Sequence, residues 1–269
     1  MPYFTTLDGC KIYYQRHNID TSQPVVIFLN GTTQTTLYWG AHVPAFSRHF
    51  RLLFYDARTQ GQSAIGKLPL NLDRHVSDLQ ELYAHLGIKT AHLVGLSHGA
   101  RVALAVAADS PNMVDRLVIC SLGVRTSYRS RIAVQSWLKI LQLSGLEAMA
   151  WAALPTVFGS GFLRHHNKTM GMFVAALAKR NTTEALLAQL EAILQYPPPT
   201  RLPDEFKGPA LILSGSEDGL VSPEDAGQLA NLCKARHEKL NGIGHSIPAE
   251  APQVFKKLVL EFLTQATGK

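Results

Sequence analysis

One serine lies in a pattern that is typical of an activated nucleophile. The pentapeptide 95–99 reads Gly-Leu-Ser-His-Gly, with Ser97 at its centre, between an apolar stretch and an alanine-rich stretch. A strand, a sharp turn and a helix in that order would lift the Ser97 hydroxyl clear of a sheet, and the flanking glycines leave room for the turn. Ser97 could instead be an ordinary N-cap of the following helix, so the pattern needs partners elsewhere in the chain.

Candidates for those partners follow two later apolar segments. A serine hydroxyl is almost wholly un-ionised at neutral pH, so a nucleophilic serine needs a neighbouring base. His245 follows Gly-Ile-Gly in a predicted tight loop, and it is the best placed of the eleven histidines. A carboxylate must then hold the imidazole in one tautomer. Asp218 and the adjacent Glu217 both follow the apolar run 210–213, and either could do this.

The negative charge that develops during attack on a carbonyl group requires backbone donors. We expect one from the N–H of His98, at the start of the helix that follows Ser97, and the other from Thr32, in the loop that follows the run 25–29. The His98 imidazole is interpreted as a packing group rather than a second base. His165 and His166 would point in different directions on a helix and have no Cys or acidic neighbour at ligand spacing, so no metal and no cofactor are expected.

Strand-like and helix-like segments alternate around these residues. Apolar runs that predict strands lie at 3–7, 11–16, Val25–Leu29, Arg51–Tyr55, Ala91–Leu96, 116–122, 210–213 and 238–240. Helices are predicted at Leu72–Leu86, 97–108, Pro223–Leu232 and 251–265. Asp8-Gly9 between the first two strands is the signal of a two-residue hairpin. Alternation of this kind predicts an α/β fold, with a mostly parallel sheet covered on both faces.

The alternation stops between residues 123 and 205. This stretch contains only helical patterns, at 132–143, 146–154, 170–178 and 184–194, and it ends in a proline-rich segment at 197–203. We therefore predict a sheet domain formed by residues 1–122 and 206–269, interrupted by an all-helical insertion at 123–205. Nine Lys/Arg against five Asp/Glu make the insertion basic, which is either a solvated surface or a bias toward an anionic substrate.

Composition excludes several classes of protein. A hydrophobic fraction of 46% and a charged fraction of 17% are typical of a folded protein, and no run of eighteen apolar residues predicts a membrane span. The net charge of +6 is scattered and comes with no nucleic-acid motif, so no nucleic-acid partner is expected. Three widely spaced cysteines and the absence of a secretory pattern at Met1 predict a reducing, cytoplasmic location, with Cys120 buried.

Taken together, five motifs in one order resemble the α/β-hydrolase family, and within it the capped group of enol-lactonases, small esterases and carbon–carbon bond hydrolases. The matching segments are 28–31, Tyr38-Trp39, 55–63, the Gly215-x-x-Asp218 loop, and Gly244-His245 followed by Glu250. The resemblance implies an eight-stranded sheet, a helical cap at 123–205, and the chain order nucleophile, acid, base. It also implies Asp218 rather than Glu217 as the acid. The catalytic residues would then be Ser97, Asp218 and His245.

Two departures from the family pattern leave the acyl acceptor open. Asn30 replaces the usual His, and Thr59-Gln60 replaces the usual Gly-His before Gly61. Both are similar to a branch of bacterial acyltransferases that move 3-hydroxyacyl groups from a carrier. The leading interpretation is a serine hydrolase of a carboxylic ester, lactone or related small acyl substrate. An acyltransferase with a non-water acceptor is the second, and a non-catalytic ligand-binding module is the third.

The insertion is rich in large apolar side chains. In the family, the cap covers the active site and sets substrate choice, so these side chains imply a small-molecule acyl substrate with an apolar part. The side chains predicted to bind it are Trp137, Trp151, Phe162, Met170 and Phe173. The pattern predicts neither the specific substrate nor the oligomeric state.

Overall fold

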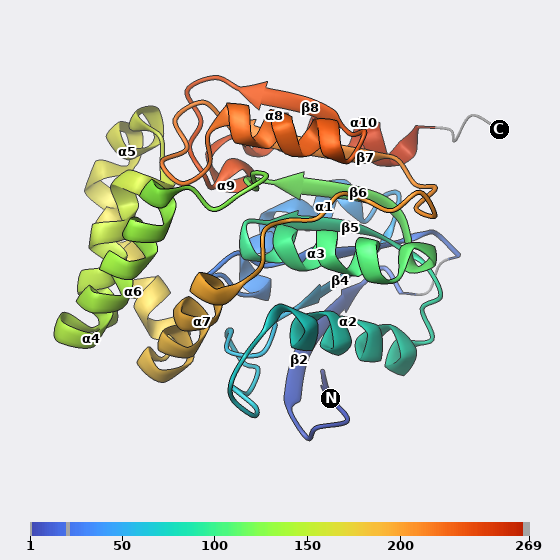
Figure 1. The fold of residues 1–269 in the computed structure, drawn as a ribbon, viewed down its shortest axis with the longest axis horizontal. Helices are drawn as coiled ribbons and strands as arrows, with labels where there is room; N and C mark the ends of the chain where they lie inside the picture. Colours follow the sequence, from blue (N-terminus) through green and yellow to red (C-terminus); the bar gives the residue numbers. More distant parts are fainter. Residues whose placement is uncertain (1, 20–21, 266–269) are drawn as a thin grey trace.

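The computed structural model describes residues 2–19 and 22–265, and these residues form an eight-stranded sheet flanked by helices (Figure 1). The strand order is β1-β2-β4-β3-β5-β6-β7-β8. Strand β2 runs antiparallel to β1 and β4, and the other neighbouring strands are parallel. The strands are β1 (Tyr3–Thr5), β2 (Lys11–His17), β3 (Val25–Leu29), β4 (Arg51–Tyr55), β5 (Ala91–Leu96), β6 (Val114–Cys120), β7 (Ala210–Gly215) and β8 (Arg236–Leu240).

The apolar runs in the sequence form the centre of this sheet. Every residue of β3, β5 and β7 is buried, as expected for parallel strands covered on both faces. Strand β8 lies at the edge and carries charged side chains, which is a common way to keep an edge strand from pairing with another chain. The predicted α/β fold with a mostly parallel sheet is confirmed.

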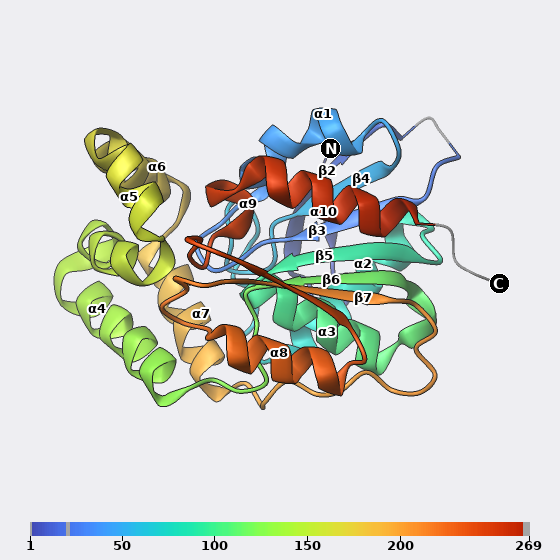
Figure 2. The same cartoon turned by 90° about the horizontal axis from the view of Figure 1, so that it is seen from above.

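Helices cover the two faces of the sheet (Figure 2). Helices α2, α3 and α8 pack on one face and bury one apolar cluster, whereas α1 and α10 pack on the other face and bury a second cluster. The helices outside the insertion are α1 (Val43–Phe46), α2 (Leu72–Leu86), α3 (His98–Asp109), α8 (Pro223–Leu232), α9 (Ile247–Glu250) and α10 (Pro252–Thr264), with short 3-10 helices η1 (Thr36–His42) and η2 (Pro111–Met113).

Between β6 and β7 the chain leaves the sheet and forms four α-helices beside the carboxyl ends of the strands (Figure 1). These helices have apolar clusters of their own. We call residues 128–195 the helical insertion. Its helices are α4 (Tyr128–Val157), α5 (Ser160–His166), η3 (Asn167–Thr169), α6 (Met170–Arg180) and α7 (Thr183–Gln195).

Helix α4 is the one described helix long and apolar enough to cross a membrane by length and composition alone. It is not a straight rod, because Gly145 has φ 81° and ψ −177° and divides it into two arms. The two arms correspond to the helices predicted at 132–143 and 146–154. Both arms belong to the insertion, where α4 packs against α6 and α7.

Local details differ from the sequence-based expectations. The predicted two-residue hairpin at Asp8-Gly9 is wrong, because pairing of β1 with β2 ends at Thr5 and Lys11 and leaves a five-residue loop. The Thr6 N–H donates to the Cys10 carbonyl at 2.9 Å and the Cys10 N–H donates to the Thr6 hydroxyl at 2.9 Å, which closes this loop. The short helices η1, α1, α5 and α9 were also not predicted, because so few residues carry no helical periodicity.

Candidate active site

Ser97 lies between β5 and α3, at the carboxyl edge of the sheet. Its backbone has φ 54° and ψ −111°, in the left-handed region that favours glycine, so the turn is strained. Ser97 occupies the N-cap position of α3, yet its side chain makes no capping hydrogen bond. The hydroxyl is therefore not used to stabilise the helix, and it lines a cavity.

The two glycines of the pentapeptide allow close approach of neighbouring backbone. A Cβ atom at Gly99 would lie 2.3 Å from the carbonyl oxygen of Leu29 in β3. A Cβ atom at Gly95 would lie 2.5 Å from the carbonyl oxygen of Gly99. Both distances are far inside van der Waals contact, so the sharp turn at Ser97 requires glycine on both sides.

His245 and Asp218 meet at the same edge of the sheet. The His245 Nδ1 lies 2.8 Å from the Asp218 Oδ2, and the Asp218 side chain is fully buried. The other carboxylate oxygen, Oδ1, accepts backbone N–H groups from Leu220 at 2.8 Å and Val221 at 2.9 Å. The His245 Nε2 is buried, has no hydrogen-bond partner among the described residues, and belongs to a residue that lines the cavity with Ser97.

The competing carboxylate, Glu217, points elsewhere. Its side chain is solvent-exposed and accepts the N–H of Ser160 at 2.6 Å, and hydrogen bonds from Ser160 lower the pKa of Glu217. Glu250 stabilises the loop that carries His245 by accepting hydrogen bonds from the N–H groups of Gly159, Gly244 and Ser246. Glu217 and Glu250 thus fix the loops, and Asp218 alone of these acids contacts the imidazole.

The loop that follows β3 lines the same cavity. Gly31 donates its N–H to the Gln34 side chain at 2.8 Å, which closes the loop around Thr32 and Thr33. Thr33 has a φ of 66°, again in the left-handed region. Thr32 and His98 both line the cavity, and the N–H of His98 lies in the first turn of α3, where backbone donors have no partner within the helix.

Asn30, which departs from the family pattern, does not reach the cavity. Its side chain is buried, donates to the Tyr55 carbonyl at 3.0 Å, and accepts the Trp39 indole N–H at 2.8 Å. Gln60, the second departure, donates to the Gly31 carbonyl at 3.0 Å. Both residues therefore support the loop that carries Thr32, and neither lines the cavity wall.

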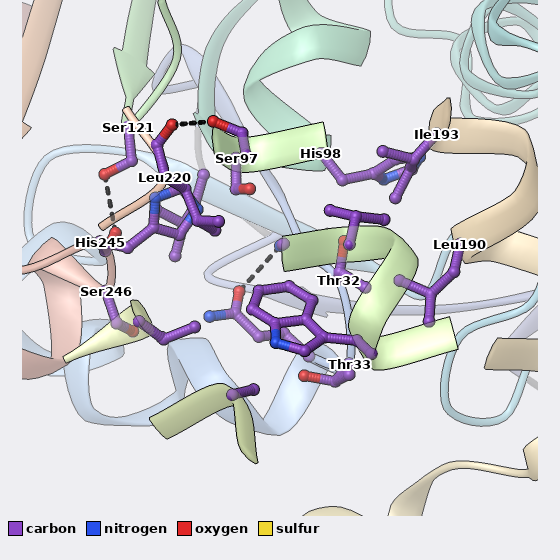
Figure 3. A pocket seen from close by; sticks show the side chains of 18 of the residues that line it. Thr32, Thr33, Ser97, His98, Ser121, Leu190, Ile193, Leu220, His245 and Ser246 are labelled. Carbon is purple, nitrogen blue, oxygen red and sulfur yellow. Dashed lines mark hydrogen bonds between the residues drawn. The ribbon is translucent and has the colours of Figure 1, made fainter. Parts of the chain in front are cut away.

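The His98 imidazole points away from His245 toward α7 (Figure 3). Its Nε2 lies 3.2 Å from the Tyr196 hydroxyl, and its ring packs edge-on against His75 at 4.8 Å between centroids. Burial, together with the nearby Arg101, lowers the pKa of His98 to about 4, so the ring is neutral at pH 7. This environment fits the packing role expected for the side chain.

The cavity, of about 260 Å³, lies between the carboxyl edge of the sheet and the helical insertion (Figure 3). Apolar side chains from α4, α6 and α7 form much of its wall. Of the five side chains predicted to bind substrate, Trp137 and Phe173 line the cavity. The other three predicted side chains lie outside the cavity wall: Trp151 is 45% exposed, whereas Phe162 and Met170 pack inside the insertion against the cluster around Phe158.

Several lining residues were not recognised in the sequence. Ser121 has a φ of 57° and donates its hydroxyl to the His245 carbonyl at 2.7 Å, which helps to fix the histidine backbone (Figure 3). The hydroxyls of Tyr38 and Ser246 lie 2.9 Å apart on the cavity wall. A single serine directly after an apolar strand gives no sequence signal of this kind.

Among the described residues, no group of three or more His, Cys, Asp and Glu side chains is placed to hold a metal ion. His165 and His166 contact each other edge-on at 4.7 Å between ring centroids. All three cysteines are free and buried, so the prediction of a buried Cys120 is confirmed.

Comparisons with known proteins agree with this architecture. The sequence profile of the alpha/beta hydrolase fold family matches residues 24–252. The chain is 26% identical over 267 residues to a protein named "Putative carbamate hydrolase RutD" from Caulobacter vibrioides, covering 97% of each. It is similar to the crystal structure of MGS-M2, an α/β hydrolase enzyme from a deep-sea metagenome library. The two have a TM-score of 0.90 and 28% identity, and the match covers 99% of this chain and 98% of MGS-M2.

A second solved structure, the enol-lactonase from Burkholderia xenovorans LB400, has a TM-score of 0.87 at 26% identity and covers 98% of this chain and 100% of its own. The profile match extends over most of the chain, including the turn at Ser97 and the loops that carry Asp218 and His245. This chain is an α/β-hydrolase enzyme of the alpha/beta hydrolase fold family.

Proposed function

We propose that this hydrolase cleaves a carboxylic ester, lactone or related small acyl substrate through an acyl-enzyme on Ser97. The observation that carries the proposal is the pairing of His245 Nδ1 with Asp218 at 2.8 Å. It leaves Nε2 buried beside the cavity that Ser97 lines, with no hydrogen-bond partner in residues 2–19 and 22–265. An imidazole held this way has its proton on Nδ1 and a free lone pair on Nε2.

In the proposed reaction, the Ser97 oxygen attacks the substrate carbonyl carbon while His245 Nε2 takes the hydroxyl proton. The oxyanion is held by the backbone N–H groups of Thr32 and His98. His245 then gives its proton to the leaving oxygen, and the acyl group stays on Ser97. Water, deprotonated by His245, attacks the acyl-enzyme; as the bond to Ser97 breaks and the acid leaves, His245 returns the proton to the Ser97 oxygen.

The helical insertion acts in this proposal as a cap that closes the cavity over Ser97. Its apolar wall, with Trp137, Met149 and Phe173, suits the apolar part of a substrate. Names of relatives support acyl chemistry of this general kind, since they include an enol-lactonase and a protein named as a carbamate hydrolase. Three free cysteines support the proposed cytoplasmic location.

Transfer to an acceptor other than water is the less favoured candidate. Its motivation is the pair of departures at Asn30 and Thr59-Gln60 together with the basic insertion, but the Asn30 side chain is bonded to Tyr55 and Trp39 away from the cavity. Asn30 therefore cannot select the acceptor by direct contact, and hydrolysis is the simpler proposal.

The test is labelling and turnover. A fluorophosphonate probe should label the protein, and digestion should locate the label on Ser97 rather than on the other cavity serines Ser121, Ser130 and Ser246. Ser97→Ala should abolish both labelling and hydrolysis of short p-nitrophenyl esters while the far-UV circular dichroism spectrum stays the same. Labelling that persists in Ser97→Ala would refute the proposed nucleophile.

A further inference from the structure

Arginine is the only one of Lys, Arg, Asp and Glu found among the described residues that line the cavity. Three arginines line the cavity, Arg101 from α3, Arg125 from the segment before α4, and Arg180 from the end of α6. None of the cavity-lining residues in the described chain is Asp or Glu. Arg125 is largely exposed and pairs with Asp225 at 3.1 Å, and Arg180 is exposed, so Arg101 is the buried cation of the three.

Within the described part of the chain, Arg101 lacks the carboxylate partner that a buried arginine usually has. It is 8% exposed, donates to the Pro197 carbonyl, and makes a long contact of 3.4 Å with the Thr126 hydroxyl. No ion pair to it is found among the described residues. By contrast, the equally buried Arg58 donates to both Asp8 and Asp78 at 2.6 to 2.9 Å.

The two arginines also differ in electrostatic balance. Burial lowers the pKa of Arg101 to about 10, and no carboxylate contributes an opposite effect. Burial also lowers the pKa of Arg58, but hydrogen bonds to Asp78 and Asp8 more than offset it and raise the pKa above its ordinary value. Burial of the Arg101 charge therefore carries a desolvation cost, and an anion that enters the cavity would offset that cost.

Burial without a carboxylate is not by itself a binding site, as Arg116 shows. Arg116 is 5% exposed, but its two terminal nitrogens each donate to a backbone carbonyl, of Phe262 and Gln265, and it does not line the cavity. Arg101 differs on both counts, since it lines the cavity and one of its terminal nitrogens has only the distant Thr126 hydroxyl.

We propose that the substrate carries a free carboxylate, bound by the guanidinium of Arg101 while the scissile carbonyl lies at Ser97. Arg101 is one helical turn beyond Ser97, to whose carbonyl its backbone N–H donates at 2.9 Å. A substrate that reaches both groups is a half-ester of a dicarboxylic acid, or a lactone with a carboxylate side chain. Arg125 and Arg180 then attract it at the rim. This inference rests on the proposed function, because it takes Ser97 as the reacting group.

The experiment compares esters that differ only at the far end. Monomethyl glutarate and methyl pentanoate have the same acyl length, with a carboxylate in one and a methyl group in the other. We expect kcat/KM for the half-ester to exceed that for the neutral ester, with the preference decreasing at high salt. Pairs up to monomethyl suberate and methyl octanoate locate the best spacing. Equal kcat/KM values in every pair would overturn the inference.

The preference should depend on Arg101. In Arg101→Met, the ratio of kcat/KM for half-ester over neutral ester should fall about 10- to 100-fold, the range typical of a hydrogen bond to a charged group. Arg116→Met is the matched control, since it removes an equally buried arginine outside the cavity and should leave the ratio unchanged. A ratio that falls equally in both variants would show a general structural effect and contradict the inference.

Binding separates this inference from the proposed reaction. In Ser97→Ala, calorimetry should detect monomethyl glutarate, and binding should weaken about 10-fold or more in Ser97→Ala/Arg101→Met. If the native enzyme hydrolyses neither ester but binding depends on Arg101, the proposed function fails and the anion site stands. If both esters are hydrolysed and the half-ester binds Ser97→Ala equally well with and without Arg101→Met, the proposed anion site is wrong and the proposed reaction stands.

Discussion

Replacing Asp218 by asparagine is expected to disable His245 for a reason that the structure makes specific. The Oδ1 of Asp218 accepts two backbone N–H groups, from Leu220 and Val221. An asparagine must keep its oxygen at that position, because its NH₂ group would otherwise face two donors. It would then present the NH₂ group to His245 Nδ1, where Asp218 now presents a carboxylate oxygen at 2.8 Å.

The size of the effect follows from counting hydrogen bonds. Turning the amide so that its oxygen faces His245 keeps one bond to Nδ1 but loses both backbone bonds, and each part-buried N–H left unsatisfied costs about 1–3 kcal/mol. The asparagine therefore holds His245 as the Nε2–H tautomer, which cannot accept the Ser97 proton. We expect kcat for short p-nitrophenyl esters to fall by about 10² to 10⁴, the upper value being that of the same change in a serine protease.

The assay measures kcat and the rate of fluorophosphonate labelling in Asp218→Asn, with Glu217→Gln as the control. Glu217 is the adjacent, exposed carboxylate that contacts Ser160 instead of His245, so its variant should keep kcat within about twofold. Urea unfolding of both variants checks that the fold is retained. A kcat for Asp218→Asn within tenfold of the native value would refute the tautomer argument.

Three further variants test the packing and electrostatics of the fold. Gly99→Ala should lower the free energy of unfolding in urea by about 3 kcal/mol or prevent folding, because the added Cβ meets the β3 backbone. Gly161→Ala is the control: it has open space around it and should change the free energy of unfolding by less than about 0.5 kcal/mol. Burial lowers the pKa of His42 to about 4, so the folded state binds fewer protons than the unfolded state between pH 4 and 6.5. His42 should thus contribute about 2 kcal/mol to the loss of stability as pH falls from 7 to 5, and His42→Phe should remove that part of the slope; an unchanged slope would count against the burial argument. Asp78→Leu should cost about 3 kcal/mol in thermal unfolding, because it leaves the buried Arg58 with only the partly exposed Asp8.

The central strands and the mostly parallel sheet could be predicted because burial on both faces leaves a strong sequence signal. The runs at 25–29, 91–96 and 210–213 are apolar at every or nearly every position, and each forms a fully buried strand. The parallel arrangement also explains why Asp218 and His245 could be located, although the choice of Asp218 over Glu217 depended on the family resemblance. Each follows a strand of a parallel sheet, and the carboxyl ends of such strands gather at one edge.

The cavity wall could not be predicted, because composition does not determine which side of a helix faces inward. Trp137 and Trp151 lie on the two arms of one bent helix, and the bend at Gly145 gives the arms different directions. Trp137 lines the cavity and Trp151 faces solvent. Met170 and Phe173, three residues apart on α6, likewise divide between the inside of the insertion and the cavity. Only the packing of helix on helix decides these cases.

The charge of the cavity has two origins with different consequences. Counting charges assigned the basic excess to the insertion, but the buried cation, Arg101, belongs to the core helix that also carries the Ser97 turn. The insertion contributes Arg180 and most of the apolar wall. Because α3 is packed against β5 and β6, the distance from Ser97 to Arg101 is fixed by the core. We therefore expect changes in the insertion to alter which apolar groups fit, while the preference for a carboxylate stays with the core.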